Sequence, residues 1–238
     1  LQPSGNVMFL KGGLYFLCAW PAAAHFFLAR RARCATKYHG QPIHMYVMPH
    51  SPGQPPEYFR RNLLLSLGAG AKHIDHFWVA PQENYSENYV SWQYPEMFQA
   101  IFETNHDLAA VEPLLLNAKS RPSRIAVITG KATAINEDSA PVNLAADKFL
   151  KQCHLAGKPV QNICRKDQQL IYLALRQAQY QVDLITEEDI FEGNRLAQYK
   201  AVYFAGEWVH TRAVPKLKAW VRAGGILYAS TGLGHLNQ

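Results

Sequence analysis

Aromatic residues mark the ends of the strands predicted for the first half of the chain. Trp20 and His50 lie at or just after strand ends, and Trp78 and Tyr85 follow in the next strand and its loop. Aromatic faces can stack on the apolar faces of a ligand. The pattern therefore suggests a ligand-binding rim. The alternative, in which these rings fill the core or cover the strand ends, stays open.

Two carboxylates belong to the same region of the sequence. Glu83 and Glu87 lie in the polar and aromatic loop QENYSENYVSWQY, directly after the strand that carries Trp78. Carboxylates placed at the carboxyl ends of strands could serve as acid, base or nucleophile. Their other interpretation is as solvated loop side chains.

The element that positions these residues is a strand, helix, strand unit at 41–81. Ile43–Met48 is an apolar run of strand length, and His73–Val79 is a second strand. Between them, Glu57–Leu67 has the apolar spacing of a helix that Gly68 and Gly70 end. A crossover of this length requires parallel strands, with the helix covering one face.

The flanking segments extend this unit to three successive strand and helix pairs. Leu14–Trp20 is predicted as a strand, and a helix follows from Pro21 to about Tyr38. A further helix opens at Pro95 and continues to about Asn117. The apolar stretch Val7–Ala29 could also be a membrane span, but its lysine, glycine pair, proline and histidine favour the strand and helix.

A polar hinge at Lys119–Ser123 separates this half from a second α/β pattern. Thr211 is expected to cap a helix that Gly224 and Gly225 end. The predicted strands are Arg124–Thr129, Gln181–Ile185, Tyr199–Ala205 and Ile226–Ser230, and the predicted helices are Val142–Cys153, Lys166–Ala178 and Arg212–Ala223. This order is typical of a doubly wound, flavodoxin-like sheet.

The composition of the chain argues against some classes of function. The 238 residues are 48% hydrophobic, which is enough for a substantial core, and the net charge is +6. The basic residues are scattered and form no stripe interleaved with aromatics, which argues against nucleic-acid binding. The four cysteines show no metal-ligand spacing. They are compatible with the cytoplasm, which is slightly favoured, but an oxidising compartment with a bridge between Cys153 and Cys164 stays open. No cofactor or metal is expected; His25, His73 and His76 are predicted to be packed residues.

Two further activities lack their key residues in the second half. Glutaminase chemistry needs a nucleophilic Cys on a sharp turn after a strand, and the corresponding turn, Ala205–Trp208, contains none. The predicted loop Gly130–Pro141 has a single glycine, so it does not form a phosphate-binding loop. The second half is therefore interpreted as structural, with surfaces available for oligomer contacts.

Several motifs resemble glycoside hydrolase family 42, the bacterial β-galactosidases. The run YKAVYFAGEWVHTRAVPKLKAWVRAGGILYASTG is similar to the glutamine-amidotransferase-like trimerisation domain that follows the barrel in that family. The first half is similar to the end of the family's barrel in its Trp20-Pro21 pair, the run Pro52-Gly53-Gln54, the helix end LGAGA and the pair Phe77-Trp78. The resemblance covers most of the chain.

The resemblance implies retaining hydrolysis of galactosides by two glutamates at the carboxyl rim of a barrel. The family's acid/base would lie on an earlier strand than this chain contains. Its nucleophile should end the strand Ile43–Met48, where the chain instead reads Val47, Met48, Pro49, His50. Neither Pro nor Met can form a glycosyl ester, so the usual nucleophile is not in place. Glu83 and Glu87 are the carboxylates that could be recruited.

The predicted fold is α/β, with the C-terminal part of a (β/α)8 barrel at 1–118 and a flavodoxin-like, trimerisation-type domain at 119–238. The chain is interpreted as a piece of a longer, β-galactosidase-related protein that acts on or binds a galactoside-like carbohydrate. The expected substrate-binding residues are Trp78, His50, Trp20 and Tyr85. The alternative is a non-catalytic oligomerisation module, with a trimer as the form that the resemblance suggests.

Overall fold

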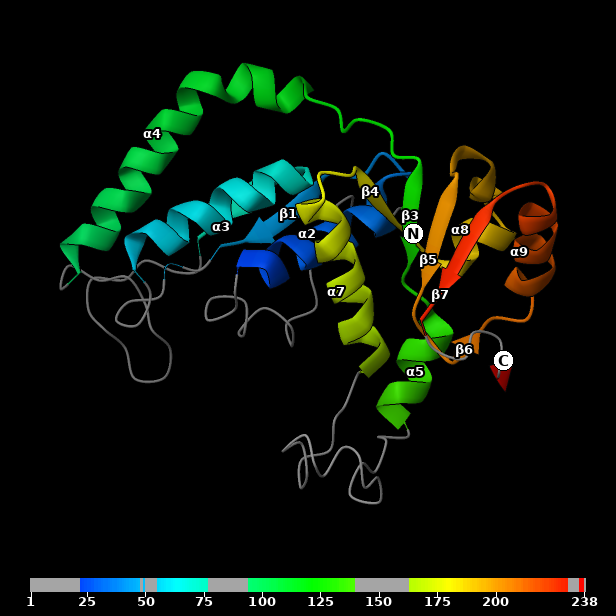
Figure 1. Cartoon of the computed structure of the whole chain (residues 1–238). Helices are drawn as coiled ribbons and strands as arrows, with labels where there is room; N and C mark the ends of the chain where they lie inside the picture. Colours follow the sequence, from blue (N-terminus) through cyan, green and yellow to red (C-terminus); the bar gives the residue numbers. More distant parts are fainter. Residues whose placement is uncertain are drawn as a thin grey trace, which may run out of the picture. The chain divides into compact units, whose positions relative to one another are not determined.

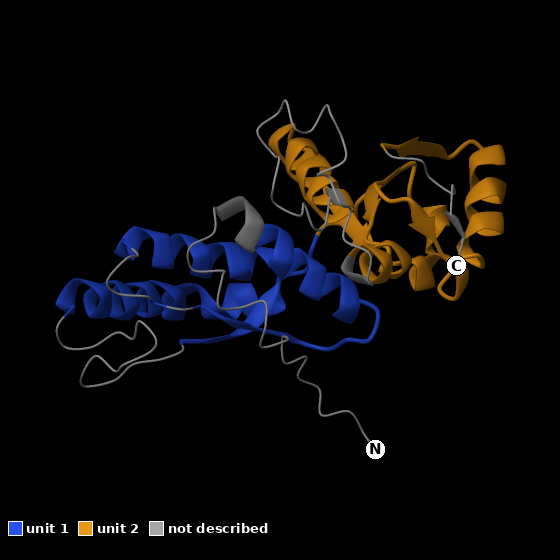
Figure 2. Ribbon diagram, turned by 90° about the horizontal axis from the view of Figure 1, so that it is seen from below, with its two compact units in different colours: residues 1–120 blue, residues 121–238 orange. Residues whose placement is uncertain are grey.

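The computed structural model describes residues 22–47, 49, 55–76, 94–139, 163–230 and 236–237 (Figure 1). The chain divides into two compact units, residues 1–120 and residues 121–238 (Figure 2). Both units are of mixed α/β structure, and their strands pair in parallel. The α/β class predicted from the sequence is therefore confirmed.

The first unit contains the predicted strand, helix, strand arrangement. Its elements are α2 (Ala22–Thr36), β1 (Ile43–Tyr46), α3 (Pro56–Ala69), β2 (Ala71–Asp75) and α4 (Pro95–Asn117). Strands β1 and β2 are parallel, with Met45 opposite Ile74 and Tyr46 opposite Asp75. The helix predicted from Pro21 corresponds to α2, and the one predicted from Pro95 to α4.

Side chains alternate between the two faces of β1, and the apolar ones pack against the helices. Met45 packs in a cluster with Ala29 and Ala32 of α2, whereas Val47 packs with Phe59 of α3 and Met97 of α4. Phe59 and Met97 are completely buried. This face of the strand therefore holds the three helices, since successive strand residues point to opposite sides.

The junction between α3 and β2 is tighter than the sequence suggested. Gly70 takes a left-handed backbone conformation with φ of 109°, and its N–H bonds to the carbonyls of Ser66 and Leu67. Glycine adopts this conformation without steric penalty. The helix can therefore end and the strand begin within one residue, at Ala71. The predicted start at His73 was wrong for this reason.

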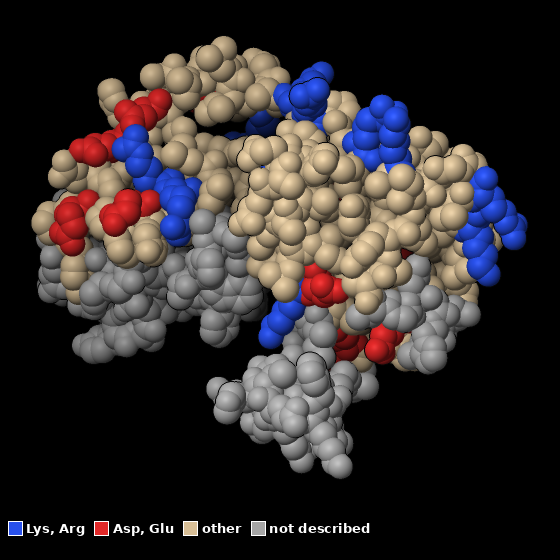
Figure 3. Space-filling view, in the orientation of Figure 1, with Lys and Arg blue, Asp and Glu red and all other residues tan. Residues whose placement is uncertain are grey.

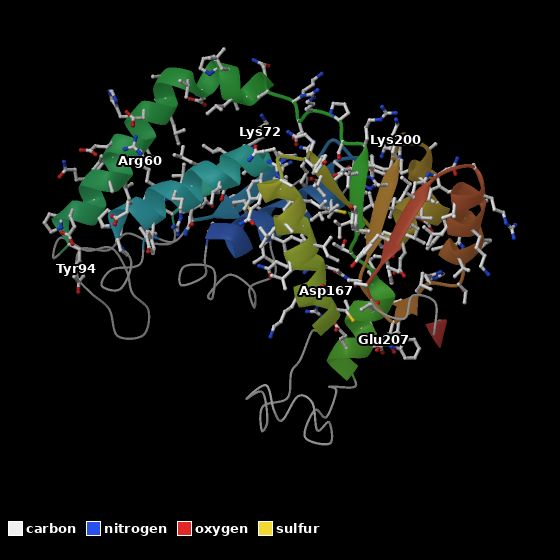
Figure 4. The ribbon with its side chains drawn as sticks, in the orientation of Figure 1. Arg60, Lys72, Tyr94, Asp167, Lys200 and Glu207 are labelled. Atoms are coloured by element: carbon white, nitrogen blue, oxygen red, sulfur yellow. The ribbon has the colours of Figure 1, made fainter. Side chains whose placement is uncertain are left out.

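The end of α4 is held by a lysine from β2. The Nζ atom of Lys72 donates to the carbonyl oxygens of Leu115, Leu116 and Ala118, with the Leu116 bond at 2.9 Å (Figure 4). The last carbonyls of a helix have no partner within the helix. An ammonium group there satisfies them and complements the negative end of the helix dipole.

The second unit is built on a parallel sheet of four strands in the order β4-β3-β5-β7. The strands are β3 (Ile125–Ile128), β4 (Val182–Ile185), β5 (Ala201–Phe204) and β7 (Ile226–Ala229), with a short pair β6 (Trp208–Val209) and β8 (Leu236–Asn237). The helices are α5 (Lys131–Ser139), α7 (Ile163–Gln177), α8 (Glu187–Phe191), the 3-10 turn η2 (Arg195–Gln198) and α9 (Ala213–Arg222).

One face of this sheet carries the main core of the second unit. Ile128, Val202 and Phe204 pack there with Ile190 of α8 and Leu217 of α9. Helix α7 packs against β3 and β4. The four strands predicted for this unit and the helices predicted at 166–178 and 212–223 are present, and the ends of the two helices differ from the prediction by one to three residues.

Two local predictions for the second unit were wrong. The predicted loop at 130–141 contains helix α5, because the carboxylate of Glu187 accepts a hydrogen bond from the first-turn N–H of Ala132. Thr211 does not cap α9. That helix begins at Ala213, and the capping position falls on Arg212, whose side chain makes no cap.

Other predictions remain untested by the structure. The predicted strand Leu14–Trp20 and helix Val142–Cys153 lie outside the described residues. Within the described part of the chain, no helix combines the length and apolarity needed to span a bilayer. On the face shown in Figure 3, the Lys and Arg side chains of the described residues form separate groups.

Candidate functional site

Strands β1 and β2 end at the same edge of the first unit. The N–H of Val47, just past β1, donates to the carbonyl oxygen of Asp75, the last residue of β2, at 2.9 Å. His76 then follows β2, with its Nδ1 atom 3.4 Å from the carbonyl oxygen of Val47. The carboxyl ends of parallel strands are the usual location of sites in α/β proteins. This edge is therefore the candidate site.

The site residues predicted from the sequence cannot be located at this edge. Outside the described residues lie Trp20, His50, Trp78, Glu83, Tyr85 and Glu87. The structure brings none of them together and separates none of them. Their proposed roles in catalysis and sugar binding stay predictions.

The resemblance implies a nucleophilic glutamate at the end of the strand, where the chain reads Val47, Met48, Pro49, His50. Of these, Pro49 follows β1 and Val47, and its side chain is buried. A pyrrolidine ring has neither a lone pair for attack nor an ionisable group. The described part of the edge therefore contains an inert, packed residue at this position.

A polar cluster lies on the face of β1 and β2 opposite the helices. The Nε2 atom of His44 lies 2.6 Å from Oδ2 of Asp75. The His44 ring also lies 5.3 Å from that of Tyr46 and 6.2 Å from that of His73, centroid to centroid. These four side chains share one face because they alternate with Met45 and Ile74 along the strands.

His44, Tyr46 and Asp75 were not among the site residues predicted from the sequence, and His73 was predicted to be packed. His73 is instead exposed, so that prediction was wrong. Strand alternation alone could have identified the cluster, since both strands carry polar residues at every second position. His76 is half-buried, with its ring 5.1 Å from that of Phe59, in agreement with the predicted packing role.

The pair formed by His44 and Asp75 has a recognisable chemical capacity. A carboxylate beside an imidazole holds the ring in one orientation. Such a pair can donate to or accept from a sugar hydroxyl, or move a proton. Among the described residues, no three His, Cys, Asp or Glu side chains are grouped to hold a metal ion.

In the second unit, the carboxyl edge of the sheet is filled by internal hydrogen bonds. Glu187, only 2% exposed, accepts from the N–H groups of Ala132 at 3.2 Å and His210 at 2.7 Å. The buried side chain of Gln168 donates to the carbonyl of Ala205 at 2.8 Å. Because the start of α5 already receives a carboxylate from within the chain, it is not free to bind an external anion.

The turn after β5 is also closed by side chains. A Cβ atom on Gly206 would lie 2.3 Å from the hydroxyl oxygen of Thr133, which donates to the carbonyl of Trp208 at 2.7 Å. There is no room at Gly206 for the nucleophilic side chain that glutaminase chemistry would need. The structure is consistent with the absence of a Cys from this turn.

Cys164 stands in the first turn of α7, and its thiol is not activated. Burial and the nearby Glu137 carboxylate raise its pKa to about 11, and its N–H donates to Glu137 at 2.6 Å. A nucleophilic cysteine needs a lowered pKa and a positively charged neighbour. Cys164 is therefore a structural thiol.

Alkylation should test this conclusion. At pH 8, a pKa of about 11 in place of the ordinary thiol value of 9.0 lowers the thiolate fraction of Cys164 about 100-fold. We expect iodoacetamide to label it far more slowly in the folded protein than in urea, as followed by peptide mass spectrometry. Folding stability should also fall as the pH rises from about 9 toward 11, because the unfolded thiol ionises first. Equal labelling rates in the two states would contradict a buried, protonated thiol.

Comparison with known proteins finds similarity among solved structures. No protein-family model matches the sequence, and no curated protein matches it. Among solved structures, the GH42 β-galactosidase Gan42B aligns with a TM-score of 0.66 at 16% identity, over 92% of this chain and 31% of Gan42B. The fold is similar to that of part of a GH42 β-galactosidase. A catalytic mutant of Gan42B from G. stearothermophilus gives a TM-score of 0.68 at 17% identity, over 91% of this chain and 30% of the other.

A third structure extends the likeness to an archaeal protein. The polyextremophilic β-galactosidase of the Antarctic haloarchaeon Halorubrum lacusprofundi aligns with a TM-score of 0.63 at 15% identity, over 90% of this chain and 30% of that one. The chain spans about a third of the length of these β-galactosidases. At this level of identity, the similarity concerns the fold.

Proposed function

We propose that the chain is a piece of a β-galactosidase-related glycoside hydrolase that acts on or binds carbohydrate, without the family's nucleophilic glutamate. The observation that carries the proposal is the fold likeness to GH42 β-galactosidases, which extends over 92% of the chain. The proposed architecture is the end of a (β/α)8 barrel, followed by a flavodoxin-like domain of the trimerisation type. The parallel βα units and the strand order β4-β3-β5-β7 support it.

The face with His44 and Asp75 suits this architecture. In a barrel of parallel strands, the helices cover the outside and the opposite face of each strand points inward. Helices α2, α3 and α4 pack on the Met45 and Val47 side of β1. His44, Tyr46, His73 and Asp75 would then point into the barrel. Polar and aromatic side chains there could bind sugar hydroxyls and ring faces.

The chemistry would differ from that of a retaining galactosidase because the strand end Val47 to His50 contains no carboxylate. Retaining hydrolysis needs two carboxyl groups about 5–5.5 Å apart. A nucleophile would have to come from elsewhere, and Glu83 and Glu87 are the carboxylates that the chain offers. Binding without hydrolysis is the other form that the proposal takes.

A binding measurement tests the proposal. We expect galactose or a β-galactoside to bind saturably in calorimetric titrations, and Trp78→Ala to weaken binding about tenfold or more, through loss of an aromatic stacking surface. Tyr180→Ala is the control, because Tyr180 is an exposed aromatic residue in the second unit. Hydrolysis of a chromogenic β-galactoside that disappears in the Glu83→Gln, Glu87→Gln double variant would assign catalysis to that loop. No saturable binding to any galactoside would contradict the proposal.

The second candidate function is a non-catalytic assembly module. It is favoured by the carboxyl edge of the second unit, where Glu187 and Gln168 fill the position in which α/β proteins usually bind ligands. In this form the protein would assemble as a homo-oligomer, and the resemblance suggests a trimer. Concentration-dependent trimers without sugar binding would select it.

A further inference from the structure

The charged side chains of helix α9 are all basic. Ala213 and Leu217 of this helix are buried in the core of the second unit, while Val214 and Trp220 pack at the margin of that core. The helix and its capping position carry four exposed cations and no acidic residue: Arg212, Lys216, Lys218 and Arg222. One of the separate basic groups in Figure 3 lies over α9.

These charges do not serve the helix itself. Arg212 and Lys216 are four positions apart, as are Lys218 and Arg222, so each pair places like charges on neighbouring turns, where they repel. Arg212 also lies at the amino end of the helix, which the helix dipole makes positive. Only Arg222, in the last turn, complements the dipole. The stability of α9 therefore does not account for the four cations.

The neighbouring acidic residues leave most of this charge uncompensated. Arg212 lies 3.6 Å from Glu192, which follows helix α8. Helix α8 packs against α9, but its acidic residues have partners outside α9: Glu187, Glu188 and Asp189. Among the described residues, no ion pair includes Lys216, Lys218 or Arg222. Three of the four cations are therefore available to an anionic partner.

The exposed side of α9 offers charge and little else. Pro215 and Ala219, between the cations, have short side chains, and Val221 is the one exposed large hydrophobic residue of the helix. Protein interfaces usually contain an apolar or aromatic core. Surfaces that bind single-stranded nucleic acid usually present aromatic rings to the bases, whereas Trp220 is half-buried against the core. These features favour a polyanion that is held by its charges alone.

We propose that the basic side of α9 binds a linear polysaccharide whose sugars carry carboxylate groups. From Arg212 to Arg222 the helix extends about 15 Å, so several cations can contact one chain at the same time. Individually weak contacts of this kind add up along a polymer. The choice of a polysaccharide rests on the proposed carbohydrate function, whereas the charge of the surface does not. The surface belongs to the second unit, and the candidate site belongs to the first.

Titration with polygalacturonate tests the need for charge. We expect calorimetry on the full chain at low ionic strength to show saturable binding that weakens as salt is added, because salt screens exposed charges. The methyl ester of the same polymer keeps the sugar chain and loses the carboxylate charges. It should bind at least about tenfold more weakly. Absence of polygalacturonate binding, or equal binding of the ester, would overturn the proposal.

Two triple variants of equal net charge test the location of the surface. The first removes the three uncompensated cations of α9 and should lower the affinity about tenfold or more: Lys216→Gln, Lys218→Gln, Arg222→Gln. The control removes three exposed cations outside α9 and should change the affinity less than about twofold: Lys119→Gln, Arg121→Gln, Lys166→Gln. Both variants lower the formal net charge from +6 to +3. Because all six side chains are exposed, the circular dichroism spectra should be unaltered. Equal losses of affinity would assign binding to net charge and overturn the proposal.

A single-stranded DNA oligomer tests the class of polymer. It should bind more weakly than polygalacturonate of similar charge, because the exposed side of α9 has no aromatic ring on which bases could stack. Tighter binding of the DNA would overturn the proposal. Galactoside binding without polygalacturonate binding would overturn this inference alone. Polygalacturonate binding without galactoside binding would contradict the proposed function and still support the surface on α9.

Discussion

Replacement of Glu187 by alanine should lower the free energy of unfolding of the second unit by about 3 kcal/mol or more. The Glu187 side chain is fully buried, and its two carboxylate oxygens accept from the N–H groups of Ala132 and His210. Alanine would leave both donors without their acceptor and open a space beside Gly130, where a Cβ atom would be 3.5 Å from the carboxylate. Urea denaturation followed by circular dichroism measures the loss.

The adjacent residue provides a matched control for this variant. Glu188 is 33% exposed and pairs with Lys131 at 2.7 Å, so Glu188→Ala should cost less than about 1 kcal/mol. Burial acts to raise the pKa of Glu188, but the Lys131 ammonium outweighs it and lowers the pKa. The small stabilisation from this pair is present at neutral pH and is lost as the pH falls through that lowered value. Equal destabilisation by the two variants would contradict a special role for Glu187.

Replacement of Phe59 by alanine should destabilise the first unit by about 3–5 kcal/mol. The Phe59 ring is 0% exposed and joins the cluster of Val47, Leu63 and Met97. The centroid of the Phe59 ring also lies 5.1 Å from that of the His76 ring. Val47 after β1 and His76 after β2 both pack against this ring. We therefore expect Phe59→Ala to weaken any sugar binding at the candidate site as well. Thermal unfolding and calorimetric titration measure the two effects.

Tyr58 is the control for the Phe59 variant. It precedes Phe59 in α3, is 44% exposed, and places its ring 4.2 Å from the Arg61 guanidinium carbon. Tyr58→Ala removes an aromatic ring of similar size from the surface of the same helix and should cost no more than about 1 kcal/mol. If both variants lost the same stability, the burial of Phe59 would not be the cause.

Local patterns in the sequence predict much of the fold because they act over short distances. The apolar stripe of α3, with Phe59 and Leu63, requires only helical periodicity. The stop at Gly70 requires only one residue with a left-handed backbone. The parallel pairing of β1 and β2 follows from the length of the crossover between them.

The errors arise where distant residues decide local structure. In the first turn of helix α5, the N–H of Ala132 donates to the carboxylate of Glu187, which is 55 positions away in the chain. No pattern within 130–141 could reveal this acceptor. The contact between His44 and Asp75 likewise depends on the register of β1 and β2. The sequence alone does not show which residues of the two strands lie side by side. The predicted sugar-site residues, such as Trp78, lie outside the described residues and remain predictions.

The hydrogen bonds from Lys72 of β2 to the end of α4 determine where the chain could be truncated in an experiment. Lys72 reaches across 43 to 46 positions to the carbonyls of Leu115, Leu116 and Ala118. The boundary between the compact units falls after Ser120, so the lysine and its three acceptors belong to the same unit. A first half truncated before Leu115 would keep the cation and lose every acceptor. The shortest fragment of the first unit that keeps all three hydrogen bonds of Lys72 therefore extends through Ala118.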